Sequence, residues 1–175
     1  MPDTFTHKNH DFQVELEHDD SVKPPWKEFD CHGVVSNWRP IGSKRAEERI
    51  LSRDRQSCLF YDWRASVAKA KKEGWRPTHE NPRESEFEFN LRVASMKRGE
   101  AAHLAVEQDF DRLRDWCDDR WRYVGVVVTD LEHAHKASIW GVESDAHDHI
   151  ASLMIELAED ILREMKTSES MGENA

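Results

Sequence analysis

Apolar and polar residues alternate strictly in the first predicted strand. Within residues 10–18, HDFQVELEH, the apolar residues Phe12, Val14 and Leu16 are separated by polar side chains. Successive side chains of a strand point to opposite faces of a sheet, so a period of two indicates a strand that is buried on one face. We therefore predict a half-buried strand here.

Three further segments predict strands before the first helix. Residues 32–38, HGVVSNW, are apolar at their centre and are followed by Pro40, which cannot donate a ladder hydrogen bond. Residues 48–53 and 57–61 predict a hairpin, because a polar turn at 54–56 separates two segments that contain apolar residues.

The first helix has clear signals at both ends. Asp62 is a favourable N-cap and Gly74 a favourable C-cap, and together they enclose a predicted helix over residues 63–73. Residues 75–97 hold two prolines and four glutamates without a regular apolar period. We expect a loop there, with a helical turn or a short strand around residues 87–91.

Helical periodicity returns at about Gly99 and is followed by an apolar strand. Residues 123–129, YVGVVVT, are almost continuously apolar, which predicts a strand in the centre of its sheet. The helix before it carries one apolar stripe with steps of three or four residues: Ala102, Val106, Phe110, Leu113, Cys117 and Trp121.

A hairpin partner and a long helix close the chain. Residues 138–144 return as a strand, and Ser144 or Asp145 caps the helix that follows. We expect residues 167–175 to be disordered. The helix carries the most regular apolar stripe of the chain: Ile150, Leu153, Met154, Leu157, Ala158, Ile161, Leu162 and Met165.

These elements predict one α+β domain over residues 1–166. Strands gather early, helices occupy the middle, and a hairpin with a long helix follows. Segregated strands and helices favour a mostly antiparallel sheet of five to six strands with two or three helices packed on one face.

Composition predicts a cytoplasmic protein without a membrane span. Charged residues make up 34 % of the chain, and no apolar run approaches the ~20 residues that cross a bilayer. The first ten residues lack the basic and apolar regions of a signal peptide. Cys31, Cys58 and Cys117 are widely spaced and odd in number, so we expect free thiols in a reducing compartment and no cysteine-based zinc site.

The net charge of −10 is unevenly distributed along the chain. Residues 1–35 carry 3 basic and 8 acidic side chains, residues 36–99 carry 15 and 9, and residues 100–175 carry 7 and 18. Fields of opposite sign attract different partners if the segregation survives folding, and they cancel if folding interleaves the segments.

Histidines and carboxylates crowd into two short stretches near the C-terminus. Glu143, Asp145 and His149 are a candidate site for a divalent metal ion, because carboxylate and imidazole groups bind zinc and manganese. His133 and His135 lie on the turn at the other end of the predicted hairpin, about 20 Å away, so four histidines do not form one centre. Acidic residues at a helix start also complement its dipole, and we prefer this capping role. We therefore expect no cofactor.

The adjacent residues Cys31 and His32 resemble a nucleophile and base only superficially. Neighbouring residues on a strand face opposite sides of the sheet. We therefore expect a buried thiol beside a surface imidazole, and we name no catalytic residue.

Two charged surfaces are candidates for partner binding. A basic face over residues 39–76 would attract nucleic acid, with interleaved tryptophans available for stacking: Arg45, Arg49, Arg53, Arg55, Lys69 and Lys72. An acidic face on the second helix would imitate a phosphate backbone, with an aromatic residue as an interface anchor: Glu107, Asp111, Asp115, Trp116, Asp118 and Asp119. Core tryptophans and solvated helix faces would account for the same patterns.

Five segments resemble small uncharacterised proteins that tailed bacteriophages and prophages encode. They are HDFQVELEHDDS, PPWKE, HGVVSNW, YVGVVVT and WGVESD, and the similarity spans most of residues 10–160. The resemblance implies action inside an infected bacterium, in phage replication or against host defence, and it carries over no catalytic residue.

We therefore expect an accessory interaction protein that binds or inhibits a nucleic-acid-handling protein of the host or the phage. A metal-dependent enzyme acting on phosphoesters and a nucleic-acid-binding protein that uses the basic segment are the alternatives. The sequence does not indicate an oligomeric state.

Overall fold

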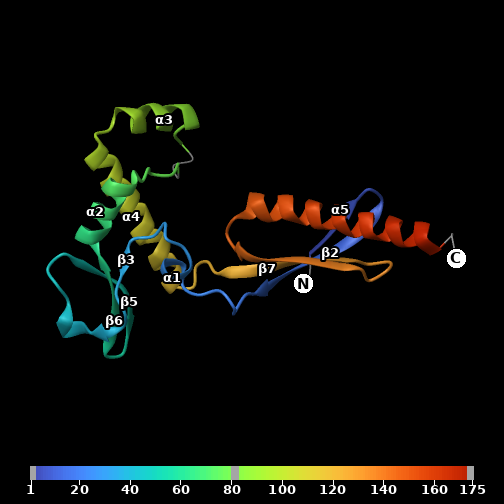
Figure 1. The fold of residues 1–175 in the computed structure, drawn as a ribbon, viewed down its shortest axis with the longest axis horizontal. Helices are drawn as coiled ribbons and strands as arrows, with labels where there is room; N and C mark the ends of the chain where they lie inside the picture. The colour runs from blue at the N-terminus through green and yellow to red at the C-terminus, as the bar shows by residue number, and fades with distance from the viewer. Residues whose placement is uncertain (1–2, 80–82, 173–175) are drawn as a thin grey trace. The chain divides into compact units, whose positions relative to one another are not determined.

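The chain forms two compact units, each with its own antiparallel sheet and apolar core (Figure 1). Unit 1 comprises Met1–Val22 and Trp121–Ala175, and unit 2 comprises Lys23–Arg120. The computed structural model describes residues 3–79 and 83–172, with side chains as far as Thr167. The predicted α+β class is confirmed, but the strands belong to two four-stranded sheets and not to one larger sheet.

Unit 1 is a four-stranded sheet with one long helix on one face (Figure 1). All neighbouring strands are antiparallel, in the order β1-β2-β7-β8. The elements are β1 (Asp3–His7), β2 (His10–His18), β7 (Tyr123–Asp130), β8 (Lys136–Glu143) and α5 (His147–Gly172).

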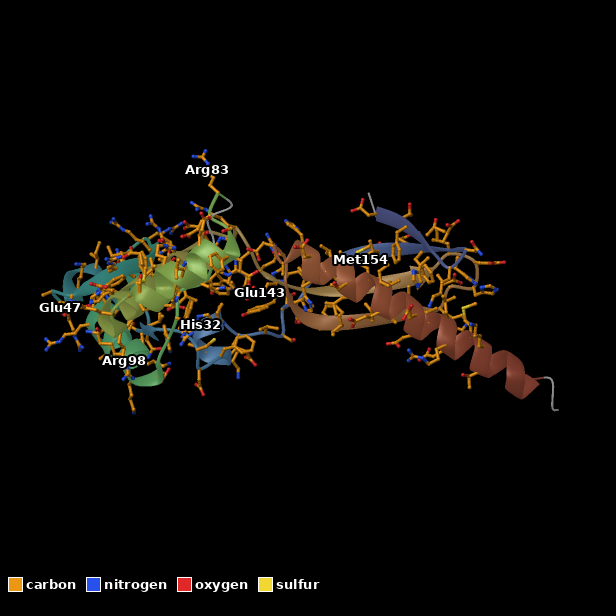
Figure 2. The ribbon with its side chains drawn as sticks, turned by 90° about the horizontal axis from the view of Figure 1, so that it is seen from above. His32, Glu47, Arg83, Arg98, Glu143 and Met154 are labelled. Atoms are coloured by element: carbon orange, nitrogen blue, oxygen red, sulfur yellow. The ribbon has the colours of Figure 1, made fainter. Side chains whose placement is uncertain are left out.

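The core of unit 1 follows the two apolar patterns that the sequence predicts, except at Leu16 of β2, which is 50 % exposed. Phe12 and Val14 of β2 lie on the same face of the sheet as Val126 of β7, and all three are buried against α5. The apolar stripe of α5 is buried except for Met154, which is partly buried (Figure 2). The alternation of β2 and the helical period of α5 thus meet in one core, because each element hides a single face.

Two predictions for the ends of unit 1 need correction. Residues 167–172 continue α5 as a helix instead of a disordered tail, and residues 173–175 lie outside the described part. The sequence pattern also missed β1, which joins β2 through Lys8 and Asn9 at φ 49° and 66°. A two-residue turn with both φ angles positive matches the twist of a hairpin, and asparagine tolerates that conformation.

Gly125 allows an indole to lie flat on the centre of this sheet. A Cβ atom at Gly125 would lie 2.5–2.7 Å from three ring atoms of Trp140. Trp140 precedes Gly141, which has a φ of 77° at the irregularity in the β7–β8 pairing. The irregularity places this half-exposed aromatic residue over β7.

Unit 2 surrounds the central strand β6 (Ser57–Asp62) with three strands and packs helices against them. β6 pairs with β5 (Glu48–Asp54) and with the two short strands β3 (Val34–Val35) and β4 (Arg39–Pro40). The predicted strand over residues 32–38 is therefore only two residues long, and the predicted hairpin is confirmed. The remaining elements are α1 (Pro25–Glu28), a 3₁₀ turn (Ile41–Ser43), α2 (Trp63–Glu73), α3 (Glu86–Ser95) and α4 (Arg98–Cys117).

The capping residues set the limits of α2 as predicted. The Asp62 side chain accepts a hydrogen bond from the Ala65 N–H at 2.9 Å, and Gly74 ends the helix at a φ of 73°. By contrast, α3 forms a full helix over Glu86–Ser95 within residues 75–97, where we expected a loop with a helical turn or a short strand around residues 87–91. Ser85 and Glu88 form a capping box that satisfies the first N–H groups of α3.

Candidate functional site

Three tryptophans from separate segments of unit 2 line one surface pocket. Trp26 lies in α1, Trp38 lies between β3 and β4, and Trp116 lies in the last turn of α4. The pocket has a volume of about 260 Å³. The ring centroids of Trp26 and Trp116 are 5.3 Å apart with an interplanar angle of 85°, which is the favourable edge-to-face arrangement. We call these residues the tryptophan pocket.

Backbone hydrogen bonds hold the Trp38 side of the pocket against the sheet. The Ser36 N–H donates to the Phe60 carbonyl at 2.9 Å, and the Phe60 N–H donates to the Ser36 hydroxyl at 3.0 Å. Trp38 nevertheless keeps 50 % of its surface exposed. An indole on a fixed backbone loses little conformational freedom on binding, so it can bury its free face at low entropic cost.

The interior of the tryptophan pocket is apolar and its rim is polar. Leu59 is buried beneath it, whereas Lys27 and Asn37 are exposed. Burial raises the pKa of the Cys117 thiol to about 11, and the charge of Asp118 adds to this effect. The Cys117 side chain is therefore a neutral, apolar part of the wall at physiological pH.

The predicted acidic face on α4 is partly neutralised by arginines. Arg49 donates to Glu107 at 2.7 Å, and Arg120 contacts Asp115 at 2.8 Å and Asp118 at 3.8 Å. The face therefore presents ion pairs at these carboxylates and not a row of uncompensated charges. Asp111 also has a polar partner, and Asp119 is exposed just after the helix. Trp116 differs from them, because it turns into the tryptophan pocket.

The predicted basic face divides into structural and exposed cations. The Arg49 guanidinium lies 3.4 Å from the ring centre of Trp63, and Lys69 donates to the carbonyls of Asp30 and His32. Arg45 lies 4.0 Å from Glu48 and donates its backbone N–H to that carboxylate. The remaining three residues of the predicted basic face are exposed: Arg53, Arg55 and Lys72. Within the described part of the chain, their side chains form no ion pair or hydrogen bond.

Glu48 is a buried carboxylate that holds this part of the sheet together. Burial alone would raise its pKa, but the bonds from the Arg39 guanidinium and the Arg45 N–H lower the pKa below the ordinary value. Glu48 is therefore ionised in the folded protein at neutral pH.

The candidate metal residues lie around the start of α5. Glu143 is the last residue of β8 (Figure 2). Asp145 lies in the following turn, and His149 is exposed in the first turn of α5. Glu143 and Asp145 each have a polar partner. Among the described side chains, in residues 3–79 and 83–167, no three His, Cys, Asp or Glu residues are arranged to hold a metal ion. The divalent metal site stays the alternative to the capping role that the sequence favours.

The other histidine pair has a structural contact of its own. His133 and His135 precede β8, so the length of that strand separates them from Glu143. The backbone N–H of His133 donates to the buried carboxylate of Asp130 at 2.7 Å, and its Nδ1 lies 3.0 Å from the same oxygen. His133 thus helps to close the turn between β7 and β8.

A carboxylate on α4 joins three separate groups in a network that the sequence did not predict. The Asp109 carboxylate accepts hydrogen bonds from the Gly33 N–H at 2.8 Å and the Tyr61 hydroxyl at 2.7 Å. His32 Nδ1 lies 2.7 Å from its other oxygen. Burial raises the pKa of the Tyr61 phenol far above its ordinary value, and the Asp109 charge adds to this, so Tyr61 stays a donor.

This network reverses the prediction for Cys31 and His32. The Cys31 thiol is exposed, and the His32 side chain is only 15 % exposed because it turns inward to Asp109. The two residues lie in a loop and not in a strand, so the alternation that led to the prediction does not apply. Gly33 is required next to them, because a Cβ atom there would lie 2.1 Å from the Tyr61 hydroxyl oxygen.

The two units differ strongly in net charge. Unit 1 contains 5 basic and 17 acidic side chains, and unit 2 contains 20 and 18. Residues 1–22 and 121–175, the outer parts of the two acidic segments, therefore belong to the same folded unit, which has a net charge of −12 when histidine is neutral. The charge contrast within the sequence is retained between the units.

No helix in the described part of the chain is long and apolar enough to cross a membrane. In comparisons with known proteins, no protein-family model, curated protein or solved structure matches this chain.

Proposed function

We propose that this chain is an accessory interaction protein that binds a nucleic-acid-handling protein in the bacterial cytoplasm. In this proposal it is encoded by a phage or prophage, and it inhibits its partner. The observation that supports binding most directly is the tryptophan pocket, in which Trp38 exposes half of its surface.

The tryptophan pocket has the properties of an interface anchor. Binding energy concentrates in a few residues, among which tryptophan is enriched, and these residues lie in apolar pockets that exclude water on binding. The rings of Trp26 and Trp116 already pack together, with their centroids 5.3 Å apart. A side chain of the partner would therefore contact a preformed wall. The pocket is rimmed by Lys27 and Asn37, which can hydrogen-bond to a partner backbone.

The net negative charge of unit 1 supports the proposal that the partner has a basic surface. Proteins that handle nucleic acid present lysine and arginine to phosphate groups, and such surfaces are attracted by a unit with a net charge of −12. Complementary charge raises the association rate and selects among partners more than it raises affinity. In this proposal the acidic unit guides the encounter and the tryptophan pocket holds the partner.

Capture from bacterial lysate with matched variants tests the proposal. The immobilised full chain should retain a nucleic-acid-handling protein that Trp38→Ala fails to retain, whereas Phe87→Ala, which truncates an aromatic residue with 76 % exposure, should retain it. Measured with the purified partner, Trp38→Ala should weaken the affinity by about 30-fold or more, as truncation of an interface anchor does.

Salt provides a second measurement on the same pair of proteins. The association rate should fall as ionic strength rises, because salt screens charges that lie further apart than about 8–10 Å. A captured protein that binds wild type and Trp38→Ala equally, or that has no role in nucleic-acid handling, would contradict the proposal.

A further inference from the structure

A second cavity in unit 2 lies between α4 and the segment that follows α2. Its volume is about 540 Å³, within the range of about 300–1,000 Å³ that small-molecule sites occupy. Trp75, Arg76 and Thr78 contribute from the segment after α2, and Gln108, Asp109 and Arg112 contribute from α4. All of them belong to the same compact unit.

Two arginines give this cavity a positive lining. Arg76 and Arg112 both reach it, and the carboxylate at its wall is Asp109. Both Asp109 oxygens are already engaged, one by His32 and the other by the Gly33 N–H and the Tyr61 hydroxyl. These bonds hold the carboxylate in the wall, where it remains an anion. With two arginines and one carboxylate the lining still has an excess of positive charge, which favours an anionic ligand.

Trp75 supplies an aromatic surface beside the two arginines. Its Nε1–H donates to Glu73 at 2.8 Å, which fixes the orientation of the indole. The Lys69 ammonium lies 5.7 Å from a Trp75 ring centroid. A planar heteroaromatic group can stack on such an indole regardless of its exact identity.

The wall of the cavity is held by paired hydrogen bonds. The Gln108 side chain accepts from the Thr78 N–H and donates to the Thr78 carbonyl, both at 2.8 Å. Pro77 is buried next to this contact. The segment that carries Trp75 and Arg76 is therefore tied directly to α4, and the site is formed before any ligand arrives.

We infer that this cavity binds a nucleoside phosphate, with the phosphate between Arg76 and Arg112 and the base on Trp75. Guanidinium groups recognise phosphate with paired hydrogen bonds, and the indole adds a face for the base. The inference does not depend on the proposed function, because none of these cavity residues lines the tryptophan pocket. The same chemistry would also accept the phosphorylated end of a single strand.

Calorimetric titration of the full chain tests this inference. The probes are the four nucleoside 5′-monophosphates, adenosine, inorganic phosphate and a short single strand with a 5′-phosphate. At least one monophosphate should bind about tenfold or more tightly than both adenosine and inorganic phosphate, because only it engages both halves of the site. Tighter binding of the strand than of every monophosphate would identify the strand end as the ligand.

Matched variants locate the binding. Arg76→Gln should weaken monophosphate binding about tenfold, and Arg53→Gln, an exposed arginine outside the cavity, should leave it unchanged. Arg112→Lys keeps a positive charge and should weaken binding less than Arg112→Gln does, with thermal unfolding showing that each variant is folded. Absence of monophosphate and strand binding at millimolar ligand, or equal affinities of wild type and Arg76→Gln, would overturn the inference.

Discussion

Removing the Asp109 carboxylate should destabilise unit 2 more than any exposed acidic substitution. In Asp109→Ala, three groups lose their acceptor: His32 Nδ1, the Gly33 N–H and the Tyr61 hydroxyl, at 2.7–2.8 Å in the wild type. Tyr61 is fully buried, so its hydroxyl cannot turn to water. Each buried donor without a partner costs about 1–3 kcal/mol, and we expect a total loss of about 3–5 kcal/mol.

The isosteric variant Asp109→Asn separates the lost charge from the lost hydrogen bonds. The amide oxygen can still accept from the Gly33 N–H and the Tyr61 hydroxyl, and the amide NH₂ can donate to His32 Nδ1 in the other tautomer of the imidazole. Only the charge assistance of the bonds is lost, so we expect a smaller decrease of about 1–2 kcal/mol in the free energy of unfolding.

Urea unfolding followed by tryptophan fluorescence measures these changes. Five of the seven tryptophans belong to unit 2, so the signal reports mainly on that unit. Glu47→Ala serves as the control, because Glu47 is 58 % exposed and its nearest guanidinium nitrogen, on Arg64, is 4.0 Å away. The control should stay within about 0.5 kcal/mol of the wild type. A loss for Asp109→Ala no larger than that of the control, or equal losses for the Ala and Asn variants, would refute the network as a source of stability.

Three further predictions concern single residues: Cys31, Gly125 and Glu48. At pH 8 a thiol reagent should rapidly modify only one cysteine of the native chain, the exposed Cys31, because burial raises the pKa of Cys117 to about 11. Rapid modification of two thiols would contradict this. Gly125→Ala should lower the free energy of unfolding of unit 1 by about 1–3 kcal/mol through the clash with Trp140, as measured by faster hydrogen exchange of the β7 amides. Folding lowers the pKa of Glu48, so the stability that its carboxylate contributes is present above its ordinary pKa of 4.5 and is lost as pH falls through the folded value. The free energies of unfolding of wild type and Glu48→Gln should therefore differ most near neutral pH and converge in acid, as measured by unfolding between pH 3 and 7.

Local signals in the sequence predicted the helices whose apolar stripe is buried. In α2, Asp62 and Gly74 set both ends, and in α5 the stripe of eight residues decided the assignment. In α3 the apolar residues follow no such stripe, because Phe89 is buried while Phe87 and Leu91 are 76 % and 63 % exposed. The detectable signal there was the capping box at residues 85–88, which marks a helix start without any information on burial.

Pairing between distant segments accounts for what the sequence did not reveal. The alternation in β2 predicts a strand but does not name β7, more than a hundred residues later, as its neighbour. The two sheets therefore could not be distinguished from one larger sheet. The same limit applies to Asp109, which meets His32 across 77 positions of the sequence.

The candidate site shows the same division between local and distant information. Trp116 stood out locally as an aromatic residue among carboxylates, and it does line the tryptophan pocket. Trp26 and Trp38 join it only because α1 and the segment before β4 are brought to the end of α4. A helical pattern identifies which residue departs from the expected polarity, whereas the partners that give the residue its role come from tertiary structure.

The pairing of β2 with β7 also decides whether the charge pattern of the sequence has a physical effect. Had the acidic ends of the chain packed separately against the basic middle, their fields would have cancelled within a Debye length of about 8–10 Å. Instead the pairing joins both ends in unit 1 and leaves the basic segments with the acids of α4 in unit 2. In unit 2, Arg49 pairs with Glu107 and Arg120 pairs with Asp115, whereas unit 1 has too few basic side chains to neutralise its carboxylates. In the proposed function, the long-range field that guides a basic partner is therefore assigned to unit 1. Of the acidic face predicted on α4, Trp116 is the residue that the proposal places at the interface, because it lines the tryptophan pocket.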